Sequence, residues 1–199
     1  MKKLLLAVVV MALVVAVATP SNAQGKMFVG VGADVLLPMG TFGDASGIGF
    51  GGSARGQYNV TPVLSVGLTA GYYTWSAKDR TVSGVSIKGA SLSGIPLRVF
   101  GKYYFMPEGK QLRVYGIAEL GFFIASVSVP AQTFGAGAFT FTTPAASASE
   151  TDFNYAPGLG IELASGKMSW DVSVRYDGIA TSGSSSGNIA ARVGVNFAI

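Results

Sequence analysis

The stretch NIAARVGVNFAI, residues 188–199, decides the fold. Every second residue from Ile189 to Ile199 is apolar, and the residues between them are asparagine, alanine, arginine or glycine. Successive side chains of a β-strand point to opposite faces, so this period of two predicts a strand with one apolar and one polar face. The stretch MSWDVSVRYD, residues 168–177, alternates in the same way.

The same alternation recurs along the chain and defines eight segments. They are residues 27–37, 48–60, 64–73, 95–105, 112–124, 153–164, 168–177 and 188–199. Strands of globular proteins average only ~5–6 residues, whereas a tilted strand that crosses a membrane needs ~9–11. The lengths of these segments, 10 to 13 residues, therefore favour membrane-crossing strands.

Charge separates the two faces of these segments. We assign ten charged residues to the polar face and none to the apolar face: Asp34, Arg55, Arg98, Lys102, Arg113, Glu119, Glu162, Asp171, Arg175 and Arg192. A water-soluble barrel would turn this charged face outward, whereas a barrel in lipid turns it into the lumen. The ten charges could line an ion path, but we favour a structural network that plugs the lumen, because a lone buried charge is too costly to leave unpaired.

Aromatic residues decide for the lipid-facing arrangement. They gather on the apolar face near both ends of the segments, as in the two aromatic girdles that mark membrane interfaces. The residues are Tyr58, Tyr103, Phe105, Trp170 and Phe197 at one end, and Tyr72, Phe122, Phe153, Tyr155 and Tyr176 at the other. The polar face is rich in glycine, as a narrow interior requires.

The connections between the segments alternate in length. Residues 38–46, 76–89, 128–151 and 178–187 form long connections, and residues 61–62, 106–111 and 165–167 form short ones. Outer-membrane barrels have short turns in the periplasm and long loops outside the cell. An open sheet in lipid would leave unpaired backbone groups at its edges. We therefore predict an all-β fold, an eight-stranded antiparallel up-and-down transmembrane β-barrel in a bacterial outer membrane. We expect it to be a monomer with both termini in the periplasm.

The N-terminus has the three-part pattern of a secretory signal peptide. Lys2 and Lys3 precede an apolar run over residues 4–18, which is too short for the ~20 residues of a spanning helix. Small residues then lead to a predicted cleavage between Ala23 and Gln24. We expect a signal peptide over residues 1–23 and one barrel domain over residues 24–199; the alternative is an uncleaved membrane anchor.

The composition excludes several kinds of chemistry. The chain has no histidine and no cysteine, which rules out His-dependent triads, thiolate metal sites and disulfides. We expect no catalytic residue, no metal and no cofactor. Residues 183–187, GSSSG, match the nucleophile elbow of hydrolases only superficially, because that motif needs a histidine. Glu162 and Asp171 could face each other as a catalytic carboxylate pair, but pairing with the nearby arginines is favoured.

Charge also argues against nucleic acid as a partner. The whole chain has a net charge of +4, and removal of Lys2 and Lys3 leaves 12 basic and 10 acidic residues, a net charge of +2. So small an excess is no footprint for a polyanion.

Two of the long connections suggest partners. Residues 126–149 carry no charge, and Phe134, Phe139 and Phe141 alternate there as in a strand. This segment either binds a host or other surface ligand, by strand addition or adhesion, or is a mobile loop; both interpretations stay open. The charged side chains of residues 76–89 are most simply a solvated tip near lipopolysaccharide phosphates.

Several short motifs resemble the small bacterial outer-membrane β-barrel family, of the type of outer-membrane protein X and the barrel domain of outer-membrane protein A. They are LPMGTFGD at residues 37–44, YNVTP at 58–62, IPL at 95–97 and GKYYF at 101–105. The resemblance covers residues 24–199. The end of the chain, Phe197-Ala198-Ile199, departs from the family, whose members commonly end in an aromatic residue that the assembly machinery reads.

The resemblance implies an integral outer-membrane protein with a structural or surface-interaction role through its long extracellular loops. Its partners would be outer-membrane lipid, lipopolysaccharide and the outer-membrane assembly machinery. Two alternatives remain: a narrow porin-like channel for small or apolar solutes, and a soluble periplasmic barrel that binds a ligand.

Overall fold

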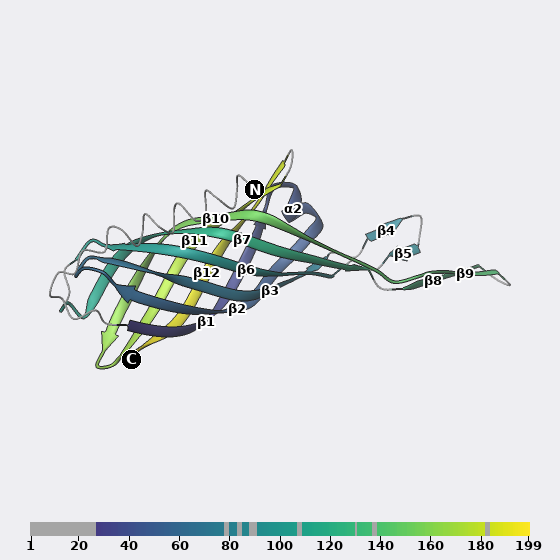
Figure 1. Cartoon of the computed structure of the whole chain (residues 1–199). Helices are drawn as coiled ribbons and strands as arrows, with labels where there is room; N and C mark the ends of the chain where they lie inside the picture. Colours follow the sequence, from purple (N-terminus) through teal and green to yellow (C-terminus); the bar gives the residue numbers. More distant parts are fainter. Residues whose placement is uncertain are drawn as a thin grey trace.

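The computed structural model describes residues 27–77, 80–82, 85–87, 91–106, 109–129, 131–136, 139–181 and 184–199. Eight long strands dominate it (Figure 1): β1 (Met27–Met39), β2 (Ser46–Asn59), β3 (Leu64–Ala77), β6 (Ser91–Tyr104), β7 (Leu112–Val129), β10 (Ala146–Ser165), β11 (Met168–Thr181) and β12 (Ser184–Ala198). The short elements are α2 (Gly40–Ala45), β4 (Arg80–Val82), β5 (Val85–Ile87), β8 (Gln132–Ala136) and β9 (Phe139–Thr143). The proposed signal peptide, with Ala23 and Gln24, lies outside the described residues.

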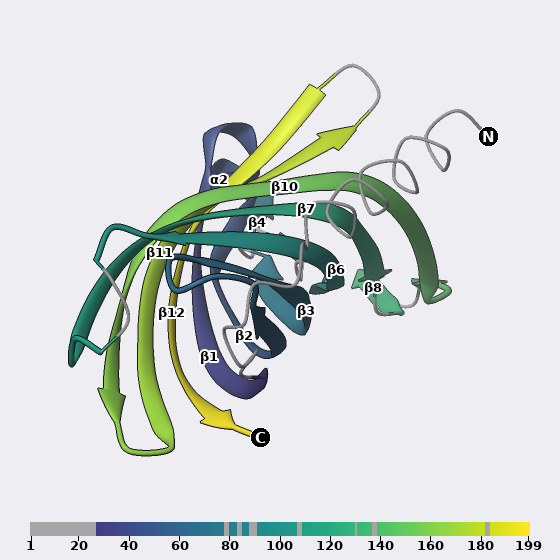
Figure 2. The same cartoon turned by 60° about the vertical axis from the view of Figure 1, so that its left-hand side comes forward.

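The eight long strands form one closed barrel in the order β1-β12-β11-β10-β7-β6-β3-β2. Each long strand pairs antiparallel with the long strand before it and the one after it, and β1 closes the barrel against β12. Asp34 of β1 is in register with Arg192 of β12. The prediction of an eight-stranded antiparallel up-and-down barrel is confirmed. Figure 2 shows the strands curving around a common axis.

Burial alternates along the barrel strands as the period of two predicts. Leu68 is 63% exposed on the outer face of β3, while the adjacent Thr69 is buried. On β11, Trp170 is exposed and Asp171 is fully buried. The apolar face is therefore the outside of the barrel, and the polar face is its core. No helix in the described part of the chain is long and apolar enough to cross a membrane.

The connections lie at two ends of the barrel and differ in size, as predicted. At one end, tight turns join β2 to β3 and β10 to β11, and the chain end lies there too, since Ile199 N donates to the Met27 carbonyl. At the other end the chain forms α2, the β4–β5 hairpin and the β8–β9 hairpin.

The predicted boundaries are wrong at the long-loop end. β7 runs to Val129 and β10 begins at Ala146, and the two strands pair continuously from Leu112–Leu163 to Val129–Ala146. Much of residues 126–149 is therefore strand, and β8 and β9 continue the pair beyond the barrel (Figure 1). Apolar alternation could not reveal this part, because residues 147–151 are exposed on both faces. The backbone groups of these two strand segments are satisfied because the segments hydrogen-bond to each other.

Candidate functional site: the buried charge network

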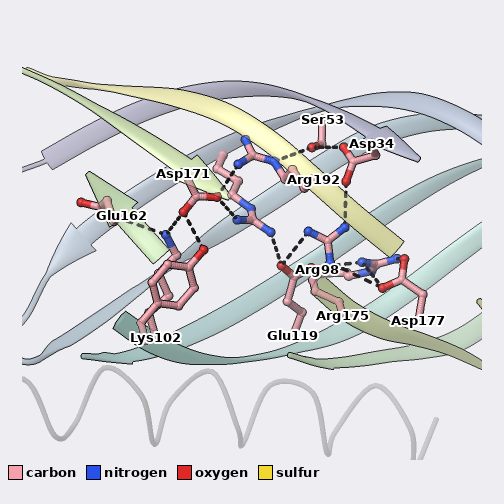
Figure 3. A network of polar contacts seen from close by, with 12 residues as sticks. Asp34, Ser53, Arg98, Lys102, Glu119, Glu162, Asp171, Arg175, Asp177 and Arg192 are labelled. Carbon is pink, nitrogen blue, oxygen red and sulfur yellow. Dashed lines mark hydrogen bonds and ion pairs between the residues drawn. The ribbon is translucent and has the colours of Figure 1, made fainter. Parts of the chain in front are cut away.

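The lumen of the barrel holds charged side chains on inward positions of seven strands. All ten charged residues that were predicted to face the interior are buried there. Nine of them form one continuous network of ion pairs, part of which Figure 3 shows. The tenth, Arg113, lies apart: its guanidinium donates to the Pro62 carbonyl and sits 3.6 Å from the ring centroid of Tyr104.

Asp171 is one centre of the network. Its carboxylate accepts from Arg192 at 2.8 Å, from Lys102 at 3.0 Å and from Arg55 at 3.3 Å. The Tyr115 hydroxyl donates to the same carboxylate at 2.6 Å. These donors come from four different strands, so this single carboxylate ties β2, β6, β7 and β12 to β11.

Glu119 of β7 is the second centre. It accepts from Arg55 at 2.6 Å and from Arg98 at 3.1 Å, and Arg175 Nη1 lies 4.0 Å from it. Arg55 therefore joins the two centres, because it binds Asp171 as well. Arg175 in turn donates to Asp34 at 2.9 Å, which brings β1 into the network.

Glu162 and Asp171 are cross-strand partners, as a carboxylate pair requires. Lys102 Nζ lies between them, 3.6 Å from Glu162 and 3.0 Å from Asp171. The cation explains how two carboxylates can stand side by side in a buried place. The structure thus favours charge pairing here over acid–base chemistry.

One member of the network, Asp177, was not among the ten charged residues predicted to face the interior. It accepts from Arg98 at 3.0 Å, and Arg175 Nε lies 3.6 Å away. The inward orientation of Asp177 could have been predicted from the sequence, because Asp177 follows Arg175 by two positions and therefore shares its face. With Asp177 the network holds five carboxylates and five cations and is neutral. The acidic members are Asp34, Glu119, Glu162, Asp171 and Asp177, and the basic ones are Arg55, Arg98, Lys102, Arg175 and Arg192.

Uncharged polar side chains complete the network, and these were not among the predicted site residues either. Ser53 links two members, because its hydroxyl donates to Asp34 and accepts from Arg192. Tyr104 donates to Glu162 at 2.9 Å, and Gln57 donates to Tyr104. The inward phase of their strands is the signal that could have identified them.

Aromatic layers lie above and below the charges. Toward the long loops, Trp75 packs edge-on against Tyr73, Phe123 and the α2 residue Phe42, and Leu36 joins this cluster. Toward the short turns, Tyr104 packs edge-on against Tyr115, with Phe100 and Ile117 beside them. The charged atoms between these layers are shielded from solvent: the side chains of Arg175, Arg192 and Asp171 are 0% exposed. A water-filled pore would leave them accessible, so the lumen is closed at this level.

The ten aromatic residues predicted to form two girdles lie on the outer wall of the barrel. Eight are exposed there, and Tyr155 and Tyr176 are half-buried against each other, with ring centroids 6.2 Å apart. Their depth in a membrane stays a prediction. The charged side chains of Lys78, Asp79, Arg80 and Lys88 lie outside what the structure describes. Within the described residues, no group of three or more acidic side chains could hold a metal ion.

Comparison with known proteins gives one family and several similar folds. The model of the outer membrane protein beta-barrel domain matches residues 5–197. Neisserial surface protein A is 15% identical, with 87% of this chain and 97% of that chain covered and a TM-score of 0.56. A major outer membrane protein of Thermus thermophilus is 13% identical, with 88% and 100% covered and a TM-score of 0.56. None of the curated proteins compared matches this chain.

Proposed function

The chain belongs to the outer membrane protein beta-barrel domain family, which places it in the outer membrane, and from this premise we propose that it is a non-enzymatic protein of the cell surface that binds other surfaces through its long loops. The short-turn end, with both ends of the barrel, would face the periplasm. The long-loop end, with α2 and the hairpins, would face outward, where lipopolysaccharide surrounds it.

The observation that carries this proposal is the ribbon formed by residues 125–129 of β7 and 146–152 of β10. It continues the barrel wall past the last residues at which burial alternates. Along it, β10 pairs with β7 on one side, whereas its pairing with β11 begins only at Phe153. The other edge of residues 146–152 therefore has no partner among the described strands, and an edge of this kind accepts a further strand.

No observation of this kind supports either alternative, the porin-like channel or the soluble ligand-binding barrel. A porin-like channel needs water along the lumen, but the charged side chains of the network are shielded from solvent. A soluble barrel needs its charges outside, but the outer wall is apolar and the charges are inside.

Processing of the N-terminus belongs to the same proposal. We expect export to remove residues 1–23, so that protein isolated from outer membranes has the mass of residues 24–199. We also propose that the barrel is a monomer inserted by the outer-membrane assembly machinery. A mass that includes residues 1–23 would contradict the signal peptide.

The surface role can be tested by removing the ribbon. Ile124 and Thr151 are cross-strand partners, so Asn-Gly in place of residues 125–150 removes the ribbon and closes the two strands with a two-residue hairpin turn. The matched control trims another loop: Ser76 and Ser91 are cross-strand partners too, so Asn-Gly can replace residues 77–90. Adhesion to cultured epithelial cells and to glass is measured for Gram-negative cells that display each variant.

We expect the ribbon variant to lose adhesion and the control variant to keep it. Slower gel migration of boiled than of unboiled samples verifies that each barrel has folded. Equal adhesion of the three proteins would contradict the ribbon as the binding element, and adhesion no greater than that of cells without the protein would contradict the surface role.

A further inference from the structure

The outer wall of the barrel is hollowed over β1, β2 and β3, beside Phe197 of β12. The hollow has a volume of about 420 Å³, and its lining includes Val31, Ala54, Gly56, Leu68, Ala70 and Phe197. All six residues are outward-facing and exposed. Because the wall there meets lipid, this hollow belongs to the lipid-facing surface and not to the lumen.

The hollow arises from the outward positions of β2. Between Phe50 and Tyr58 these positions hold only glycine or alanine, at residues 52, 54 and 56. The neighbouring strands supply larger side chains: Gly56 is in register with Val29 of β1 and with Leu68 of β3. A Cβ atom added at Gly56 would meet nothing within 4 Å. The result is a trough with a floor of small residues and apolar walls.

We propose that this trough binds one acyl chain of a phospholipid from the periplasmic leaflet of the outer membrane. It is continuous with the lipid-facing wall, so hydrocarbon is the material in contact with it. Its depth selects the leaflet, given the proposed orientation of the barrel. Gly56 lies three residues before the end of β2, and Phe197 lies one residue before the end of β12. Both strands end on the short-turn side.

A cation lies near the Phe197 side of the trough, at the end of the barrel that would meet the lipid phosphates. Lys167 is exposed in the turn between β10 and β11, and its carbonyl accepts from Ala198 N at 2.9 Å. Phe197, which lines the trough, is in register with Met168, the residue after this lysine. An ammonium group near the membrane surface attracts anionic lipid groups.

Two glycine substitutions provide the test. Gly56→Leu places a larger side chain in the trough, where a Cβ atom at Gly56 would meet nothing within 4 Å. Gly101→Leu is the matched control, because Gly101 is also on the outer wall, has equally open space for a Cβ atom and does not line the trough. Lys167→Gln removes the cation. Protein extracted from outer membranes in mild detergent is titrated with phosphatidylethanolamine, and separately with lipid A, and bound lipid is counted by native mass spectrometry.

We expect the wild type and Gly101→Leu to retain one phosphatidylethanolamine, Gly56→Leu to lose this adduct, and Lys167→Gln to weaken it. The gel shift on boiling verifies that each variant is folded. Equal retention by the two leucine variants, or preferential retention of lipid A, would overturn the proposal. A two-barrel species that Gly56→Leu abolishes would assign the trough to a second copy of the chain and would overturn it as well.

Discussion

At the scale of single residues, the charge network stabilises the barrel by covering each buried charge with an opposite one. Desolvation of an ion costs several kcal/mol, and an ion pair offsets this cost only when its geometry is good. Five carboxylates face five cations at short distances, although Arg55 Nε, Arg98 Nε and Arg192 Nη2 are buried without a hydrogen-bond partner among the described residues. Arg113, the sixth cation, is held by a backbone carbonyl and an aromatic ring instead.

Removal of the Asp171 carboxylate should be strongly destabilising. Arg55 would keep Glu119 and Lys102 would keep Glu162, but Arg192 would lose its only carboxylate partner within 4 Å among the described residues. We expect Asp171→Ala to lower the free energy of unfolding by about 3–5 kcal/mol, because it leaves an uncompensated buried charge. Urea unfolding in phospholipid vesicles, followed by tryptophan fluorescence, measures this loss.

The double variant Asp171→Ala/Arg192→Ala serves as the control for that interpretation. If the orphaned guanidinium causes the loss, removal of Arg192 should recover part of it, as a double-mutant cycle would record. Asp44→Ala, at an exposed position, should change stability by no more than about 0.5 kcal/mol. A loss below about 1 kcal/mol for Asp171→Ala would show that the network is not a major source of stability.

Glycines of the barrel differ in what surrounds them, and this difference is testable. A Cβ atom at Gly121 of β7 would collide with the Leu97 carbonyl of β6 and lie 2.7 Å from the Arg98 Cα, so backbone would have to move. We expect Gly121→Ala to destabilise the barrel by about 1–3 kcal/mol through overpacking. Gly56→Ala, which meets open space, should stay within about 0.5 kcal/mol. The urea midpoints of the two variants measure this difference in stability. Equal midpoints would show that the crowding around Gly121 does not destabilise the barrel.

At the scale of elements, α2 packs on the aromatic cluster at the long-loop end of the lumen, and we expect it to close that end. Phe42 is the contact that matters, because its ring lies edge-on to Trp75 at a centroid distance of 5.8 Å, while Trp75 itself is only 2% exposed. We expect Phe42→Ala to cost about 1–2 kcal/mol from the lost ring pair and its burial. It should also admit small molecules to Trp75.

Fluorescence quenching by acrylamide measures this access, in a Trp170→Phe background in which Trp75 alone emits. Thr74→Ala, on the outer face beside Trp75, is the control and should leave quenching unchanged. Quenching that is the same in Phe42→Ala and in its parent would mean that α2 does not close the lumen.

The elements also explain how far the sequence could predict the structure. Period-two alternation is a local signal, so the barrel strands and their faces could be identified from neighbouring residues alone. The ribbon could not, because residues 147–151 are exposed on both sides and carry no apolar alternation. Nor could α2, since six residues are too few to present a helical period.

The sequence could predict which residues belong to the charge network, but not which of them pair with each other. The inward phase identifies Arg175 from its own strand. Its partner Asp34 lies 141 residues away, and the two meet only because they project into one closed lumen. The same holds for Arg98 and Asp177, which are 79 residues apart. The number of strands, the closure of the barrel and the register of the strands together determine which side chains meet in the lumen. None of these can be read from a local sequence pattern.

At the scale of the whole molecule, the closed lumen predicts that the protein does not conduct ions. The cross-section holds two aromatic clusters and a neutral network whose central side chains are 0–2% exposed. An eight-stranded barrel is just narrow enough for its own side chains to fill it. We therefore expect wild-type protein in planar bilayers to give no steady conductance in 1 M KCl, where a general porin serves as the positive control.

Trp75→Ala/Phe123→Ala separates the two barriers inside the lumen. It removes two rings of the outer aromatic cluster but leaves the charges below it, so the variant should stay silent as well if the network is the main barrier. Salt should not open the network either, because buried pairs are screened much less than exposed ones. Uniform, ohmic steps from the wild type would contradict the closed lumen and favour the channel. Steps from the double variant alone would assign the barrier to the aromatic cluster rather than to the charges.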